Sequence, residues 1–84
     1  MPWDPMKGER LAPAWTAAQE LLRDGQWHPW DEVIQVMLDA SDLQKSTCAG
    51  VLYGAIRHGH INRTGAYSRK TKKDTRTLSW GSKG

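Results

Sequence analysis

Residues 46–61 read Ser-Thr-Cys-Ala-Gly-Val-Leu-Tyr-Gly-Ala-Ile-Arg-His-Gly-His-Ile and carry the clearest local pattern in the chain. Small and apolar side chains recur in this stretch at the spacing that places them on one face of an α-helix: Cys48, Leu52, Ala55 and Ile56. Gly59 can end that helix, because glycine readily adopts the left-handed conformation found there. Ile61 then opens a strand. The stretch therefore predicts a helix followed directly by a β-strand.

The start of this helix has two interpretations. Ser46 or Thr47 can cap it, because a hydroxyl oxygen accepts a hydrogen bond from a free backbone N–H of the first turn. Alternatively, Ser41 and Gln44 have the spacing of a capping box, which would start the helix several residues earlier. The residues from Ser41 to Lys45 form a turn in the first interpretation.

Two further helices are predicted upstream. The first begins at Leu11, has Pro13 in its first turn and ends near Asp24, where Gly25 can serve as the C-terminal glycine. The residues from Gln26 to His28 can form a brief strand, because a residue before proline favours extended geometry. The second helix then runs from Trp30 to Ala40 with one apolar face.

The residues after Ile61 predict a β-hairpin. The first strand spans residues 61–68, the charged tip spans residues 69–74, and the returning strand spans residues 75–80. Gly65 in the first strand indicates a β-bulge. Leu78 and Trp80 have the period-2 spacing of one strand face.

Large apolar side chains are few in this chain of 84 residues. Phenylalanine is absent, so we expect the five tryptophans to fill the core: Trp3, Trp15, Trp27, Trp30 and Trp80. The length suits one domain. We expect a flexible arm over residues 1–10, the folded domain over residues 11–80 and a frayed end over residues 81–84.

The net charge of +3 conceals a strong asymmetry along the chain. Residues 1–56 carry four cationic and eight acidic side chains, whereas residues 57–84 carry eight cationic side chains and only Asp74 as an acid. A cationic segment of this kind suits a polyanionic partner. A solvated basic hairpin is the alternative explanation.

The order of helix, short strand, helix, turn, helix and hairpin resembles the winged helix-turn-helix family. The resemblance rests on residues 46–52, on Ala55-Ile56 and on Gly59-His60-Ile61, together with the segment Asp-Gly-Gln-Trp-His-Pro-Trp-Asp-Glu-Val-Ile at residues 24–34. It implies an α+β winged helix, with a three-helix unit, a short strand and a C-terminal two-stranded wing. It also implies double-stranded DNA as the partner.

The resemblance places the third helix in the DNA major groove as the recognition helix. Its outward positions would be Ser46, Thr47, Ala49, Gly50, Tyr53 and Arg57. The basic residues of the wing would be Arg63, Arg69, Lys70, Lys72 and Lys73. Gly50 and Gly54 are unusual inside a helix. They can serve either close approach to DNA or tight packing against the other helices.

The outward face of the third helix departs from the family in carrying few cationic or amide side chains. We therefore expect the wing to make more of the DNA contacts, by following the phosphate backbone or entering the minor groove. The implied function is a transcriptional regulator that acts by occupying a site. The bland helix face also suits a protein–protein interaction module in a larger assembly, and the same charges could serve RNA.

The sequence shows no sign of an enzyme, a cofactor site or a metal site. His28, His58 and His60 do not combine with Cys48 in any compact zinc pattern. No apolar run approaches the about 18 residues of a membrane span, and the N-terminal residues do not resemble a signal peptide. The lone cysteine fits a reducing cytoplasm. We expect a monomer, with a dimer as the alternative.

Overall fold

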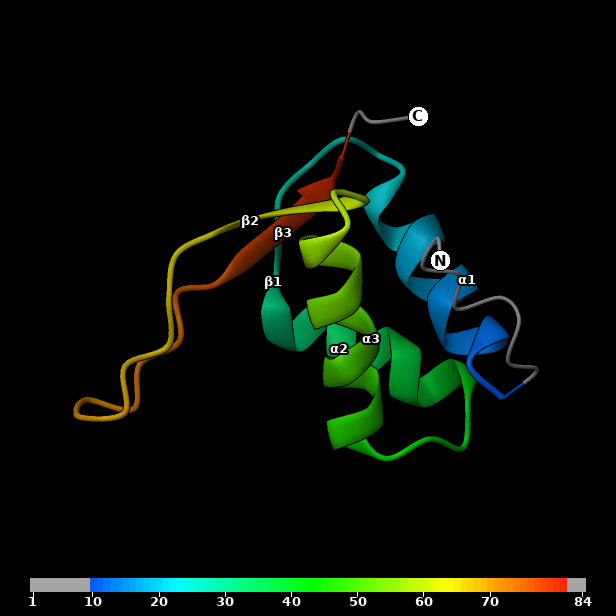
Figure 1. The fold of residues 1–84 in the computed structure, drawn as a ribbon, viewed down its shortest axis with the longest axis horizontal. Helices are drawn as coiled ribbons and strands as arrows, with labels where there is room; N and C mark the ends of the chain where they lie inside the picture. The colour runs from blue at the N-terminus through cyan, green and yellow to red at the C-terminus, as the bar shows by residue number, and fades with distance from the viewer. Residues whose placement is uncertain (1–9, 82–84) are drawn as a thin grey trace.

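The structure, a computed structural model, describes residues 10–81 and is an α+β fold of three helices and a small three-stranded antiparallel sheet (Figure 1). The helices are α1 (Ala12–Leu22), α2 (Trp30–Ala40) and α3 (Lys45–Arg57), and the strands are β1 (His28–Pro29), β2 (Ile61–Thr64) and β3 (Thr77–Trp80). The predicted elements and their order are confirmed, but the strand bounds differ: β1 lies at residues 28–29 and not 26–28, β2 ends at Thr64 and not at residue 68, and β3 begins at Thr77 and not at residue 75. Trp3, the expected arm up to residue 9 and the expected frayed residues 82–84 lie outside the described residues.

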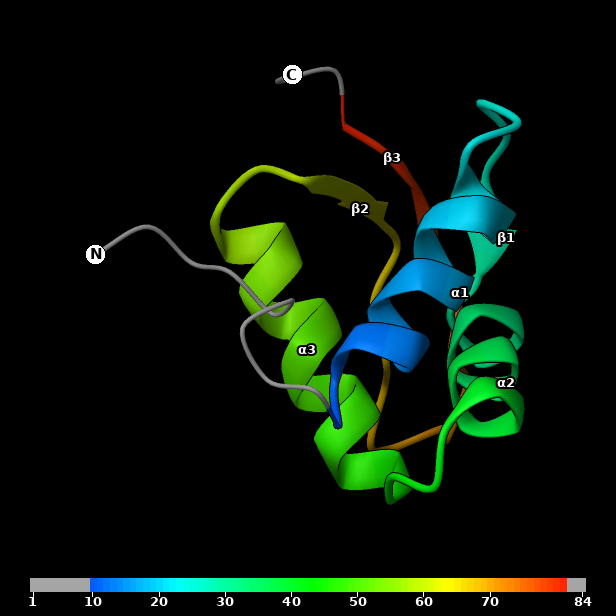
Figure 2. The same cartoon turned by 90° about the vertical axis from the view of Figure 1, so that its right-hand side faces the viewer.

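The sheet has the strand order β1-β3-β2, so the last strand of the chain lies in the middle. His28 in β1 and Arg63 in β2 both lie opposite Leu78, which is fully buried. The sheet lies at one end of the three helices (Figures 1 and 2). The pairing extends one residue past Trp80, because the Gly81 N–H donates to the carbonyl of His60 over 2.8 Å.

Proline and glycine bound α1 as expected, although the helix ends two residues early. Pro13 lies in the first turn, where its missing N–H has no partner to lose. The helix ends at Leu22, with Arg23 as its C-cap residue. Gly25 has a φ of +76°, and its N–H donates to the Leu22 carbonyl over 3.2 Å. The glycine thus closes the last turn of the helix.

The start of α3 differs from both predicted caps. The N-cap residue is Gln44, with no side-chain capping hydrogen bond, so Ser46 and Thr47 lie inside the helix. The capping box with Ser41 is also wrong. The Ser41 hydroxyl donates back to the Met37 carbonyl over 2.7 Å and accepts from the Leu43 N–H over 3.4 Å, so it ends α2 and shapes the turn.

The core is built from all three helices and the sheet, but only two of the described tryptophans belong to it. Trp15 and Trp30 are each 4% exposed, whereas Trp27 is 51% exposed and Trp80 is 37% exposed. Trp27 lies in the loop before β1, and the Trp80 ring rests on Trp15 with 5.8 Å between ring centroids. The expectation for Trp27 and Trp80 is therefore wrong. Aliphatic side chains fill the space instead: Leu22, Val33, Met37, Leu52, Ile61 and Leu78.

The β2–β3 hairpin keeps one register from its base to its tip, so the predicted bulge at Gly65 is wrong. Thr64 lies opposite Thr77, and Tyr67 lies opposite Asp74, with two residues between these pairs on each strand. A glycine is required at position 65 for a different reason, a close approach between the two backbones. Its φ is +82°, and a Cβ there would lie 2.1 Å from the Thr75 carbonyl oxygen. The side chain of Thr75 completes this close approach, because its Oγ1 accepts from the Ala66 N–H over 3.1 Å.

His28 ties the ends of α1 and α2 together. Its Nε2 lies 2.9 Å from Asp24 Oδ2, and its Nδ1 lies 2.6 Å from Glu32 Oε1. The hydrogen bond to Asp24, followed by that to Glu32, raises the pKa of His28 above its ordinary value of 6.5. The pKa of Asp24 is lowered, first by the Gln26 N–H and then by His28. The imidazolium is thus the stabilised form of this side chain.

We predict opposite effects of alanine at two glycines. Gly65→Ala should lower the free energy of unfolding by about 1–3 kcal/mol, because the residue has positive φ and no room for a Cβ. Gly50→Ala should raise it by about 0.5–1 kcal/mol, because the site lies within α3 and opens into free space. Urea unfolding of both variants measures this. Equal losses would contradict the account of both positions.

We predict that His28 makes stability depend on pH. A raised folded-state pKa contributes stability fully below the unfolded value, and this contribution is lost as pH rises through the raised value. The melting temperature should therefore fall as pH rises above about 6.5, and His28→Gln should flatten that part of the profile. Parallel profiles for the two proteins would show that the imidazolium makes no contribution.

Candidate nucleic-acid interface

The outward face of α3 is available to a partner, with one exception among its predicted members. The exposed residues are Ser46, Thr47, Gly50, Tyr53 and Arg57. Ala49 is half-buried and packs against the core, so its placement on the outward face is wrong. The core side of α3 consists of Cys48, Val51, Leu52 and Ala55. Val51 is buried too and widens this side beyond the predicted stripe.

Gly50 does not serve helix packing. A Cβ built on it would meet nothing within 4 Å. Since glycine inside a helix costs about 1 kcal/mol relative to alanine, its presence has no explanation in the stability of this fold. Of the two predicted roles, tight packing is therefore wrong for Gly50, and close approach of a partner stays a prediction.

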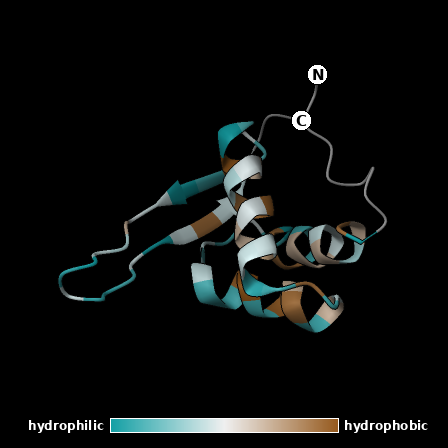
Figure 3. Ribbon diagram, turned by 60° about the horizontal axis from the view of Figure 1, so that its bottom comes forward, coloured by the Kyte–Doolittle hydropathy of each residue, from teal (hydrophilic) through white to brown (hydrophobic). Residues whose placement is uncertain are grey.

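The five basic residues predicted for the hairpin are all exposed: Arg63, Arg69, Lys70, Lys72 and Lys73. Arg63 lies in β2, and the other four lie at the tip, which is the hydrophilic end of the hairpin in Figure 3. A hydrogen bond closes the tip, because the Ser68 N–H donates to the Lys73 carbonyl over 2.8 Å. Residues 69–72 thus form a four-residue loop, a common hairpin length.

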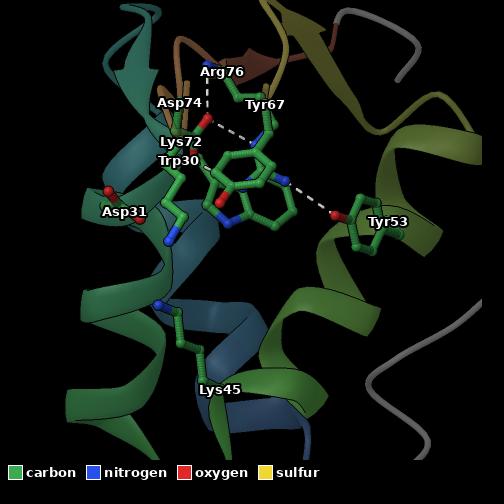
Figure 4. Close-up of a pocket in the computed structure, with 8 residues that line it drawn as sticks. All are labelled: Trp30, Asp31, Lys45, Tyr53, Tyr67, Lys72, Asp74 and Arg76. Carbon is green, nitrogen blue, oxygen red and sulfur yellow. Dashed lines mark hydrogen bonds and ion pairs between the residues drawn. The ribbon is translucent and has the colours of Figure 1, made fainter. Parts of the chain in front are cut away.

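Lys72 has a strained backbone. Its φ of 55° is in the left-handed region that residues with a side chain rarely adopt. Strain of this kind persists where the surrounding structure fixes it, and it is often found at binding sites. The Lys72 side chain lines an open groove beside the body of the protein (Figure 4).

This groove, of about 450 Å³, separates the hairpin from the helices. Its lining comprises Trp30, Asp31, Lys45, Tyr53, Tyr67, Lys72, Asp74 and Arg76 (Figure 4). It thus joins the outward face of α3 to the base of the hairpin tip. Sequence reasoning assigned Tyr53 and Lys72 to the interface, but it did not bring them together in one site.

Arg76 contacts three aromatic residues of the groove lining. Its guanidinium carbon lies 4.0 Å above the centroid of the Trp30 ring and 5.6 Å from that of Tyr67. The Nη1 group donates to the hydroxyl of Tyr53 over 3.0 Å. The Tyr53 ring in turn packs on Trp30 with 5.1 Å between centroids. One side chain therefore connects α2, α3 and the hairpin.

Asp74 neutralises Arg76 through a bidentate ion pair. The Arg76 Nε donates to Oδ1, and Nη2 donates to Oδ2, each over 2.8 Å. The Arg76 backbone N–H also donates to Oδ1 over 3.0 Å. These hydrogen bonds lower the pKa of Asp74 and raise that of Arg76. Arg76 is thus a structural cation, and the exposed cations that line the groove are Lys45 and Lys72.

The sequence analysis missed Arg76, Trp30, Tyr67 and Lys45 as members of one site. The pair Asp74 and Arg76 offered a signal, because side chains two apart on a strand point to the same face. Nothing local linked them to Trp30, which lies far away in the sequence. In the interpretation in which Ser46 or Thr47 caps the helix, Lys45 lies in the preceding turn and not in the helix.

Residues 10–81 contain no group of three or more histidine, cysteine, aspartate or glutamate side chains that could hold a metal ion. Cys48 is buried, and burial raises the pKa of its thiol, which disfavours the reactive thiolate. In the same residues, no helix has the length and apolar character needed to cross a membrane.

Comparison with known proteins finds no match to the chain among family models, curated proteins or solved structures.

We predict that Arg76 stabilises the fold through its shape as well as its charge. Arg76→Lys should lower the free energy of unfolding by about 1–3 kcal/mol, because lysine keeps the charge but loses the bidentate pair and the stacking on Trp30. Arg63→Lys is the matched control on an exposed strand position and should change it by less than about 0.5 kcal/mol. Urea unfolding compares them. Equal stabilities of the two variants would refute this role.

Proposed function

We propose that this chain is a winged-helix protein that binds double-stranded DNA and regulates transcription by occupying its site. The observation that carries the proposal is the placement of α3 and the cationic hairpin tip on two sides of one open groove. The element order supports the winged-helix assignment, with α3 as the recognition helix and the β2–β3 hairpin as the wing.

In this proposal α3 enters the major groove by its exposed face. Ser46 and Thr47 lie in its first turn, where both hydroxyls and the Ser46 backbone N–H can donate to a phosphate, while the Thr47 N–H already donates to the Gln44 carbonyl. Arg57 can reach a phosphate or a guanine edge. Gly50 lets the helix backbone come close to the DNA, which accounts for a glycine that the fold itself does not need.

The wing supplies most of the charge. Its tip carries four exposed cations, namely Arg69, Lys70, Lys72 and Lys73, with Asp74 already paired to Arg76. The tip would follow the phosphate backbone or enter the minor groove. Each phosphate that a cation neutralises releases bound counterions, so the affinity must fall steeply as salt rises.

We predict salt-dependent binding that depends on the tip. Fluorescence anisotropy with random blunt duplex DNA should give a plot of log affinity against log salt with a steep negative slope. Changing Arg69, Lys70, Lys72 and Lys73 together to alanine should make that slope shallower by about three to four units, because each phosphate contact contributes about 0.9.

The double variant Arg10→Ala, Arg23→Ala is the matched control, because neither arginine lines the groove or belongs to the tip. It should keep the slope within about one unit of the original protein. Absence of binding at low salt, or a slope that the tip substitution leaves unchanged, would overturn the proposal. A protein partner for the exposed face of α3 would then be the function to test.

A further inference from the structure

The groove has an aromatic lining that phosphate binding does not explain. Tyr53 is 50% exposed and Tyr67 is 49% exposed, and both line the groove. The Tyr53 ring packs on Trp30 and its hydroxyl accepts a hydrogen bond from Arg76, whereas the Tyr67 ring has the Arg76 guanidinium 5.6 Å from its centroid. The rest of each ring is open to a ligand. Two half-exposed aromatic rings beside lysines are typical of sites that bind unpaired bases.

The groove also has cations where a nucleotide would need them. Lys45 extends from the first residue of α3, and Lys72 extends from the hairpin tip, so the two lysines approach the groove from opposite elements (Figure 4). The lining holds three cations and two acids, so it keeps a net positive charge. Asp74 is fully occupied by Arg76, and Asp31 is an exposed residue at the start of α2.

We propose that the groove binds one unpaired nucleotide of DNA, with the base stacked on Tyr67 and Tyr53 and the adjoining phosphate held by Lys45 and Lys72. The volume of about 450 Å³ is open on the solvent side, so a strand can enter and leave it. A paired base cannot use this site, because its two faces are covered by its neighbours in the duplex. The inference rests on the proposed DNA-binding function and deepens it.

The position of the groove gives the proposed specificity a physical basis. It lies between α3, which would contact the duplex, and the wing, which would follow the backbone. A strand that leaves the duplex between these two elements passes the tyrosines. The protein should therefore prefer DNA that carries unpaired nucleotides next to a duplex, such as an overhang, over a blunt duplex.

The test compares three DNA molecules with the same double-stranded part: a blunt duplex, a duplex with a short single-stranded overhang, and one with an abasic overhang of equal length. The abasic overhang keeps the phosphates and removes the bases, so it separates stacking from charge. Overhangs of both polarities are measured by anisotropy. At the better polarity the base-bearing overhang should bind at least about fivefold more tightly than the abasic one, the low end for stacking of one base.

Two variants of Tyr67 connect this preference to the groove. Tyr67→Leu keeps an apolar side chain but removes the ring, and should weaken the preference for the base-bearing overhang, because only the Tyr53 ring is left for the base. Tyr67→Phe keeps the ring and should retain the preference. Tyr67 is half-exposed and lies outside the core, so both variants should fold, which thermal unfolding by circular dichroism checks.

Equal affinity of the original protein for base-bearing and abasic overhangs would overturn the inference, and so would an undiminished preference in Tyr67→Leu. Salt-dependent binding of the blunt duplex would still stand in both cases, so the proposed function would be unaffected. If the blunt duplex also fails to bind at low salt, the proposed function itself fails.

Discussion

The guanidinium of Arg76 holds the β2–β3 hairpin against the helices α2 and α3. The backbone prepares this contact, because the Trp30 N–H donates to the Arg76 carbonyl over 3.0 Å and continues the ladder between β1 and β3. The first residue of α2 is thereby fixed beside β3, and its ring lies under the guanidinium. Because arginine is planar and always charged, it can stack, pair with Asp74 and bind Tyr53 at once. A lysine could not make this set of contacts.

The same contact determines how the hairpin meets the helices. A two-stranded ribbon alone is only marginally stable in water, so its outer half needs support from the rest of the fold. Arg76 and Asp74 provide this support at the point where regular pairing between β2 and β3 ends. Gly65 and Thr75 preserve the register across this point through a close backbone approach. The charged tip therefore extends from a base that is anchored to α2 and α3.

The organisation of the groove also explains which charges can act on a partner. Arg76 is paired with Asp74, so its charge is neutralised within the fold. Lys45 and Lys72 keep theirs, and they enter the groove from elements that are distant in the sequence. The tyrosines complete a surface that combines positive charge with accessible rings. This combination underlies both the proposed DNA binding and the proposed site for an unpaired nucleotide.

The sequence by itself determined the three helices, the hairpin and the separation of charge along the chain. These features follow from local causes: the spacing of apolar residues in α3, Pro13 and Gly25 around α1, and the cations of residues 69–73. The exposed side of α3 followed from the same spacing, apart from Ala49. Only the tertiary structure decided that Trp27 and Trp80 stay exposed, that Gly65 serves a close backbone contact, and that Arg76 joins Trp30, Tyr53 and Tyr67. Each of these outcomes depends on which distant residue lies opposite, and helical or strand periodicity describes only the side of its own element that a residue occupies.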